Sequence, residues 1–250
     1  MRKIDINNIY ININKWHRCR YRHIILLLSW RLSCYLAYPK HLRINPDLLY
    51  KVSVIHNALL VIYSAWTFAS LSRILYNDSI VFKSNYYFQN PQFDTIIYCF
   101  YLSKYYEFGD TFLLYLNGKT PLFIKKYHHI GAVISWHLMY RYRVDMIWMA
   151  TLLNSGVHTV MYSYYLGCLL KIKQVRYIKK YITMMQLCQF FILYSNFYFY
   201  YPPIETWFNY SIITFFATYG RGIIWLFSKF YYDSYVIKER LERIGRIQYI

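Results

Sequence analysis

The chain has 250 residues, of which 57% are hydrophobic, 22% aromatic and only 16% charged. A surface facing water needs more polar residues than this composition supplies, so a soluble protein is disfavoured. The formal net charge of +18 would suit a nucleic-acid partner, but the basic residues lie between apolar segments, where they would meet lipid headgroups or anionic ligands. We therefore expect no nucleic-acid partner.

Apolar segments recur along most of the chain, and crossing a bilayer takes roughly 20 such residues. Seven segments are predicted to be transmembrane helices: 24–38, 52–76, 93–116, 122–140, 146–170, 178–201 and 207–236. The first is short and carries Arg31. Prolines lie between these segments or at their edges, where helices end. The sequence predicts an all-α, polytopic membrane protein of a single domain, 1–250, with a polar basic tail at 1–22 and a charged tail at 237–250.

Lys and Arg residues between the segments predict the orientation, because short basic loops stay on the cytoplasmic side. The loop between the fifth and sixth segments is basic, whereas the loop between the sixth and seventh holds no Lys or Arg. The basic C-terminal tail falls on the same side as the fifth–sixth loop. The C-terminus is therefore predicted to be cytoplasmic, although the basic N-terminal tail taken alone would argue the opposite.

The third segment contains Lys104, Glu107, Asp110 and Thr111. The charged groups of Lys104, Glu107 and Asp110 together would cost about 8–10 kcal/mol if they faced lipid. In a helix all four side chains lie within about a 120° arc, so we expect them to face the inside of a helix bundle. Two interpretations remain for them: a Lys–carboxylate network that joins helices, or part of a functional cavity.

Three further segments carry polar side chains at helical spacing. They are Asn154, His158, Met161 and Tyr165 in the fifth, Thr183, Gln186 and Gln189 in the sixth, and the pair His128 and His129 at the start of the fourth. Adjacent residues point about 100° apart, so the paired histidines cannot both aim at one pocket. Four inward polar stripes predict a functional cavity. The other histidines are interpreted as structural: His17, His23, His41, His56 and His137.

Two chemistries fit His128, His129 and His158. Imidazole is a common metal ligand, but a membrane di-iron centre needs several histidine boxes, and only these three and His137 lie in the central region. No metal is therefore expected. Alternatively, a neutral imidazole attacks a thioester, a second histidine moves protons, and hydroxyls and amides stabilise the developing oxyanion. This combination suits acyl transfer and requires no cofactor.

The order and spacing of these residues resemble the ELO family of very-long-chain fatty acid elongases, also called 3-oxoacyl-CoA synthases. The family motif KxxExxDT is intact from Lys104 to Thr111, and TxxQxxQ is intact from Thr183 to Gln189. The box NxxHxxMYxYY is complete from Asn154 to Tyr165 and includes Tyr162. The HxxHH box corresponds to Lys125-Lys-Tyr-His128-His129. The agreement covers roughly residues 93–194.

The resemblance implies seven transmembrane helices, six of them forming a barrel around an acyl tunnel, and residence in the endoplasmic reticulum. It also implies that long-chain acyl-CoA and malonyl-CoA condense to 3-oxoacyl-CoA, CoA and CO2. The acyl group would load onto His128, with His158 and His129 completing the catalytic set. The other motif residues, including Lys125, would orient substrate. Beyond the two CoA substrates, the resemblance suggests membrane lipid and the reductases and dehydratase of the elongation cycle as partners, and it leaves a homo-oligomer open.

Lys125 departs from the family pattern, because the HxxHH box has histidine at that position and some relatives have glutamine. This departure keeps a catalytically impaired relative as an alternative, and a non-catalytic membrane conduit is another. A conduit would open on both sides, whereas an elongase cavity would end among apolar side chains.

Basic residues near the predicted cytoplasmic side would either meet CoA phosphates or reflect topology alone: Lys119, Lys125, Lys126, Lys171, Lys173 and Arg176.

Overall fold

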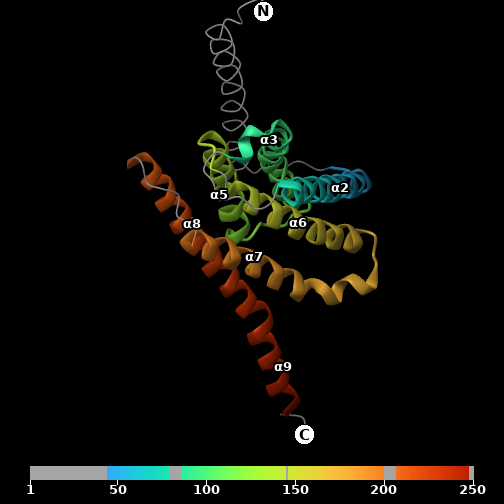
Figure 1. Cartoon of the computed structure of the whole chain (residues 1–250). Helices are drawn as coiled ribbons and strands as arrows, with labels where there is room; N and C mark the ends of the chain where they lie inside the picture. Colours follow the sequence, from blue (N-terminus) through green and yellow to red (C-terminus); the bar gives the residue numbers. More distant parts are fainter. Residues whose placement is uncertain (1–43, 79–85, 145, 200–206, 248–250) are drawn as a thin grey trace, which may run out of the picture. The chain divides into compact units, whose positions relative to one another are not determined.

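A computed structural model describes residues 44–78, 86–144, 146–199 and 207–247. The chain forms the helices α2 (Pro46–Asp78), α3 (Pro91–Tyr106), α4 (Phe108–Leu116), α5 (Phe123–Arg141), α6 (Ile147–Leu169), α7 (Lys179–Phe199), α8 (Trp207–Tyr231) and α9 (Lys238–Ile247) (Figure 1). Short turns are η1 (Tyr87–Gln89), η2 (Lys173–Ile178) and the π-helical η3 (Tyr232–Ile237). No strand occurs in the described ranges, so the all-α prediction is confirmed there. The predicted segment 24–38 and the tail 1–22 lie outside the described residues.

The predicted segments agree with the helices to within a few residues, except in two places. The segment 93–116 is two helices, because α3 ends before Glu107 and α4 begins after it. At this junction the Asp110 N–H bonds to the Glu107 carbonyl three residues back, a tighter turn than the α-helical one. At the other end of the chain, α8 ends at Tyr231, and part of the predicted tail 237–250 is the helix α9.

Three helices end in the same left-handed turn. Gly118, Arg143 and Lys171 have φ angles of 70°, 52° and 60° after α4, α5 and α6. In each case the next N–H bonds to a carbonyl five residues back, as in a Schellman cap. Only the first of these positions is glycine. The Arg143 guanidinium forms an ion pair with Asp94, which helps to hold the second turn in place.

Helix α2 is polar inside and apolar outside. Its buried polar residues are Ser53, His56, Asn57, Ser64 and Thr67, and its exposed apolar residues are Val52, Ile55, Leu59, Ile62 and Trp66. This is the reverse of a helix on a water-exposed surface, and it is typical of a helix between lipid and a polar interior. Within the described ranges, one stretch, Pro46–Asn77, is long and apolar enough to cross a membrane. The count of seven spans stays a prediction.

The helices that carry the predicted site contact one another. Helix α2 packs along α6, α6 contacts α7, and α7 contacts α8. Helix α8 in turn contacts α5, α5 contacts α3, and α3 contacts α2. Each helix of this set therefore has at least two neighbours within the set. Helix α6 also contacts α3 and α5, so the polar residues of α3, α5 and α6 can meet. The residues described from Ile44 onwards belong to one compact unit.

Close packing of α5 and α8 depends on glycine. A Cβ atom at Gly131 would lie 1.9 Å from Cε2 of the Tyr219 ring, and the Tyr219 hydroxyl donates to the backbone carbonyl of His128 at 3.1 Å. Gly131→Ala forces the buried ring to move, and overpacking of this kind costs about 1–3 kcal/mol. We expect a lower melting temperature in detergent. Gly220→Ala is the control, because its Cβ would lie 3.2 Å from the nearest atom and should change the melting temperature far less.

Candidate active site

Lys104 is a buried lysine with two hydrogen-bond acceptors and two aromatic neighbours. Its side chain is 1% exposed, and its ammonium donates to Glu107 Oε1 at 2.7 Å and to Asn154 Oδ1 at 2.5 Å. The ammonium also lies 4.1 Å from the Phe100 ring centroid and 4.8 Å from that of Trp136. A charge this far from water persists only when such partners replace its hydration. Lys104 therefore joins α3 to α5 and α6.

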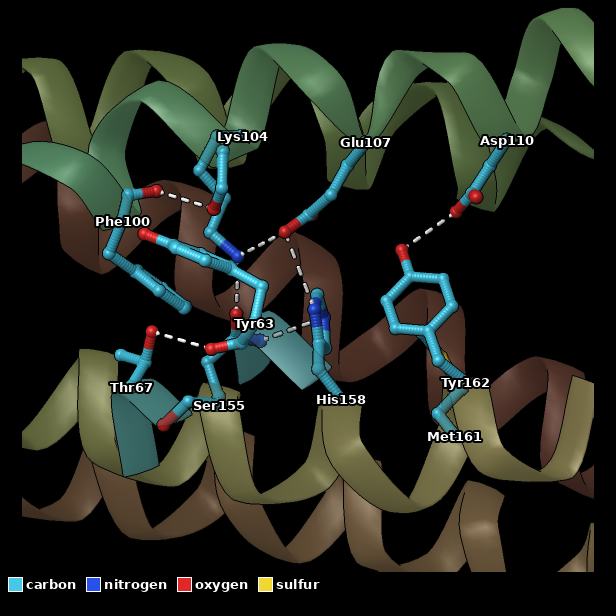
Figure 2. Close-up of polar contacts among 12 residues, drawn as sticks. Tyr63, Thr67, Phe100, Lys104, Glu107, Asp110, Ser155, His158, Met161 and Tyr162 are labelled. Atoms are coloured by element: carbon cyan, nitrogen blue, oxygen red, sulfur yellow. Dashed lines mark hydrogen bonds and ion pairs between the residues drawn. The ribbon is translucent and has the colours of Figure 1, made fainter. Parts of the chain in front are cut away.

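Glu107 connects Lys104 to a histidine on α6. Figure 2 shows the three side chains pointing toward one another between α3 and α6. His158 Nδ1 lies 3.4 Å from Glu107 Oε1, and His158 Nε2 lies 3.2 Å from Nδ2 of Asn154. Both Glu107 and His158 are buried. The carboxylate can therefore orient the imidazole.

Asp110 forms a second cluster one turn further along the chain. Its Oδ2 accepts the Tyr162 hydroxyl at 2.8 Å, as Figure 2 shows. Lys125 Nζ lies 3.8 Å from the same oxygen, so the lysine that replaces the first histidine of the box reaches the KxxExxDT motif. The remaining oxygen, Oδ1, lies 2.7 Å from Nε2 of His56. His56, interpreted as structural from the sequence, therefore contacts a residue of the predicted site.

The paired histidines of α5 point in different directions, as their adjacency predicts. The His129 ring packs against Phe108 of α4 at 5.9 Å, and the side chain is buried. The half-buried His128 lies edge-on to Phe190 of α7 at 6.0 Å and to Phe227 of α8 at 6.2 Å. The His128 ring also lies edge-on to that of His129, with centroids 5.5 Å apart.

The polar motif residues of α7 are Thr183, Gln186 and Gln189, and their contacts differ from those of the Lys104 and Asp110 clusters. Gln186 donates from Nε2 to the Met161 sulfur at 3.3 Å, which links the motifs of α7 and α6. Gln189 is buried. Thr183 is also buried, but its hydroxyl lies 3.3 Å from the hydroxyl of Tyr235 in the π-helical turn. The described hydrogen-bond partners of Thr183 are therefore the Lys179 carbonyl at the start of α7 and the Tyr235 hydroxyl in η3. Neither partner belongs to the Lys104 or the Asp110 cluster.

The predicted inward stripe of α6 is correct for three of its four members. Asn154, His158 and Met161 are buried, but Tyr165 keeps 39% of its surface accessible. Tyr162 is fully buried instead. Tyr165 lies within the same arc of the helix as the other three residues, so its exposure reflects how the neighbouring helices cover α6 and not the helical period. Among the basic residues predicted near the cytoplasmic side, Lys119, Lys171 and Lys173 are exposed and Lys126 is half-buried.

Several buried polar atoms of the predicted site have no hydrogen-bond partner within the described ranges: Glu107 Oε2, Thr111 Oγ1, His129 Nδ1, His158 Nδ1 and Gln189 Oε1. Only two further side chains, Tyr63 and Ser135, have such atoms in the same ranges. Buried polar atoms are almost always paired, so this concentration indicates a place where water or substrate groups bind. The same part of the chain holds no group of three or more His, Cys, Asp or Glu side chains arranged for a metal ion.

Two contributors to the site were not predicted from the sequence. His56 comes from α2, and Gly109 lies against it, since a Cβ atom there would be 2.8 Å from His56 Cε1. A signal for His56 is present in the sequence, because Ser53, His56 and Asn57 lie on one face of an otherwise apolar segment. That stripe predicts burial, but only the tertiary structure shows that His56 meets Asp110.

Comparisons with known proteins agree on one family. The family model described as ELO, GNS1/SUR4 family, matches residues 18–243. A fatty acid elongase named sre1 from Dictyostelium discoideum is 32% identical over 218 residues, which are 78% of this chain and 77% of the relative.

Other relatives match the central part of the chain. Fatty acid elongase 2 from Trypanosoma cruzi is 40% identical over 92 residues, 36% of this chain and 33% of the relative. Very long chain fatty acid elongase 6 from Drosophila melanogaster is 38% identical over 94 residues, 37% of this chain and 29% of the relative. The chain thus spans about a third of the length of these two proteins. No solved structure matches the chain.

Proposed function

This chain belongs to the ELO (GNS1/SUR4) family, and from that premise we propose that it condenses a long-chain fatty acyl-CoA with malonyl-CoA. The products are 3-oxoacyl-CoA, CoA and CO2, and the enzyme is an acyltransferase of fatty acid elongation. The observation that carries the proposal is the buried cluster of Lys104, Glu107, Asn154 and His158. It places an oriented imidazole beside a carboxylate inside a helix bundle.

The reaction proceeds in two steps. A ring nitrogen of His128 attacks the thioester carbonyl of acyl-CoA, the carbon–sulfur bond breaks, and CoA leaves with a proton. Malonyl-CoA then loses CO2, and the resulting enolate carbon attacks the acyl-imidazole carbonyl. The carbon–nitrogen bond breaks, the leaving imidazolate takes up a proton, and 3-oxoacyl-CoA is released with His128 restored. The Phe190 and Phe227 rings beside His128 support this role, because they present an apolar surface to the acyl chain.

The other site residues have roles that follow from their contacts. His158, oriented by Glu107 and Asn154, moves the proton of the departing CoA or stabilises the enolate. His129 and Thr111, each with an unpartnered buried atom, supply hydrogen bonds to the reacting oxygens. Gln186 holds Met161. The remaining motif residues, Asp110, Lys125, Tyr162, Tyr165, Thr183 and Gln189, orient the acyl chain and the CoA group.

The fold supports placement of this chemistry in a membrane. Six helices contact one another in the order α2, α6, α7, α8, α5 and α3, and α3 contacts α2 again. We propose that these six helices form a barrel around the acyl tunnel, within a seven-helix protein of the endoplasmic reticulum. The C-terminus is cytoplasmic in this proposal, and exposed Lys119, Lys171 and Lys173 meet the CoA phosphates there.

The test is incorporation of labelled malonyl-CoA into 3-oxoacyl product by the purified protein, with a panel of saturated and polyunsaturated acyl-CoAs. Product from any acyl-CoA supports the condensation and shows that Lys125 is compatible with turnover. Absence of product from folded protein that binds CoA contradicts the proposal and favours an impaired relative. In that case the variant Lys125→His, which restores the box, should produce activity.

A further inference from the structure

Asp110 is held by three other helices, and one of its partners lies outside every motif of the family. His56 Nε2 on α2 is 2.7 Å from Asp110 Oδ1, while Tyr162 on α6 and Lys125 on α5 approach Oδ2. The side chains of His56 and Asp110 are 7% and 9% exposed. A carboxylate so far from water needs hydrogen bonds at both oxygens. His56 is therefore an essential partner of Asp110.

The ring of His56 has little freedom to move. It stacks on Tyr106 with ring centroids 4.9 Å apart and planes inclined by 29°. On another side the backbone of α4 approaches closely at Gly109, where any larger residue would meet the ring at 2.8 Å. These two contacts hold Nε2 toward Asp110. Tyr106 and the backbone at Gly109 thus hold the His56 imidazole in one orientation.

Asp110 influences the position of His158, the proposed catalytic histidine of α6, through Tyr162. Tyr162 donates its hydroxyl to Asp110, and its ring packs edge-on against His158, with centroids 5.4 Å apart and planes at 86°. His158 also lies 3.4 Å from Glu107. A displaced Asp110 would release the Tyr162 hydroxyl and leave one side of His158 without a fixed neighbour.

We propose that His56 is a positioning residue of the condensation site. Its Nε2–H donates to Asp110, and Asp110 then fixes Tyr162 and the side of His158 that Tyr162 contacts. Lys125 adds a positive charge near the same carboxylate but no imidazole. His56 is therefore the imidazole that Asp110 contacts, and it comes from α2. This inference rests on the proposed function.

The experiment compares His56→Leu, which removes the donor, with His56→Gln, whose side-chain amide can donate from nearly the same position as Nε2. Loss of a fixed geometry at the reacting centre lowers the rate by about 100-fold, so we expect a fall of that size in kcat for His56→Leu. The glutamine variant should keep most of the wild-type kcat. In His56→Leu, kcat should fall by a larger factor than KM for acyl-CoA rises, because His56 acts on substrate only through Asp110 and Tyr162. If His56→Leu does not fold, His56→Asn replaces it, since its amide is too short to reach Asp110.

The matched control is His137→Leu. His137 Nδ1 lies 3.0 Å from the Tyr101 hydroxyl, a comparable imidazole contact that involves none of the site residues, so its loss should leave kcat unchanged. Three results would overturn the proposal: wild-type kcat in folded His56→Leu, a glutamine variant as slow as the leucine variant, or a raised KM at constant kcat.

A second measurement is independent of activity, so it separates this proposal from the proposed function. Melting temperatures are compared for His56→Leu, Tyr162→Phe and the double variant. Both substitutions act on Asp110, so the two shifts should not add. Additive shifts would show that His56 and Tyr162 are not linked through Asp110. A wild-type protein without product would contradict the proposed function alone.

Discussion

His128→Ala is expected to abolish the covalent acyl-enzyme. Without the imidazole no side chain on α5 can accept the acyl group at this position, and loss of a nucleophile lowers turnover by on the order of 10³-fold or more. The measurement is intact-protein mass spectrometry after incubation with acyl-CoA alone. The wild-type protein should gain the mass of one acyl group and release CoA, and the variant should do neither.

Gln186→Ala serves as the comparison for this prediction. Gln186 contacts Met161 through a weak hydrogen bond to sulfur, so its loss should slow turnover without preventing acyl-enzyme formation. His129→Ala tests the adjacent ring, which faces Phe108 rather than Phe190 and Phe227. It should retain the acyl-enzyme and slow the condensation. Full activity in His128→Ala would disprove the acyl-histidine mechanism.

Lys104→Met is expected to destabilise the protein strongly. The substitution leaves Glu107, which is 2% exposed, without its main countercharge in the interior. Removal of one partner of a buried ion pair costs about 3–5 kcal/mol. Thermal unfolding in detergent should show a correspondingly lower melting temperature. The double variant Lys104→Met/Glu107→Gln should regain part of the loss, because it no longer buries an unpaired charge.

Lys51→Met is the matched control for this variant. Lys51 also contacts a carboxylate at 2.7 Å, that of Asp47, but the two side chains are 65% and 67% exposed. Surface pairs one helical turn apart contribute only about 0.3–0.5 kcal/mol. A similar fall in melting temperature for Lys51→Met and Lys104→Met would mean that burial does not set the strength of the Lys104 contact.

The helices could be located from the sequence because their signals are local. Apolar length and proline positions predicted the ends of α5, α6 and α7 to within one or two residues. The break at Glu107 could not be located in this way. Gly109 lowers the helix propensity near the break, but a glycine alone does not fix where a helix ends, and the break itself is seen only in the backbone hydrogen bonds.

The candidate site was predictable to the extent that burial follows helical spacing. Lys104, Glu107, Asn154 and His158 were expected to face inward, and the structure places them in one cluster. Tyr165 was expected inside with them but is partly accessible. Helical spacing places Tyr165 on the same face as the three buried residues, and the packing of the neighbouring helices decides which residues along that face are covered.

The sequence by itself determined the class of the protein, the family motifs and the departure at Lys125. These follow from the composition, from the helical spacing of the polar residues and from the order of the motifs along the chain. Only the tertiary structure decided the pairing of groups from different helices, such as His56 with Asp110 and Lys125 with that same carboxylate. The physical reason is that spacing fixes directions within one helix, whereas contacts between helices depend on how close two backbones approach, as Gly109 permits beside His56.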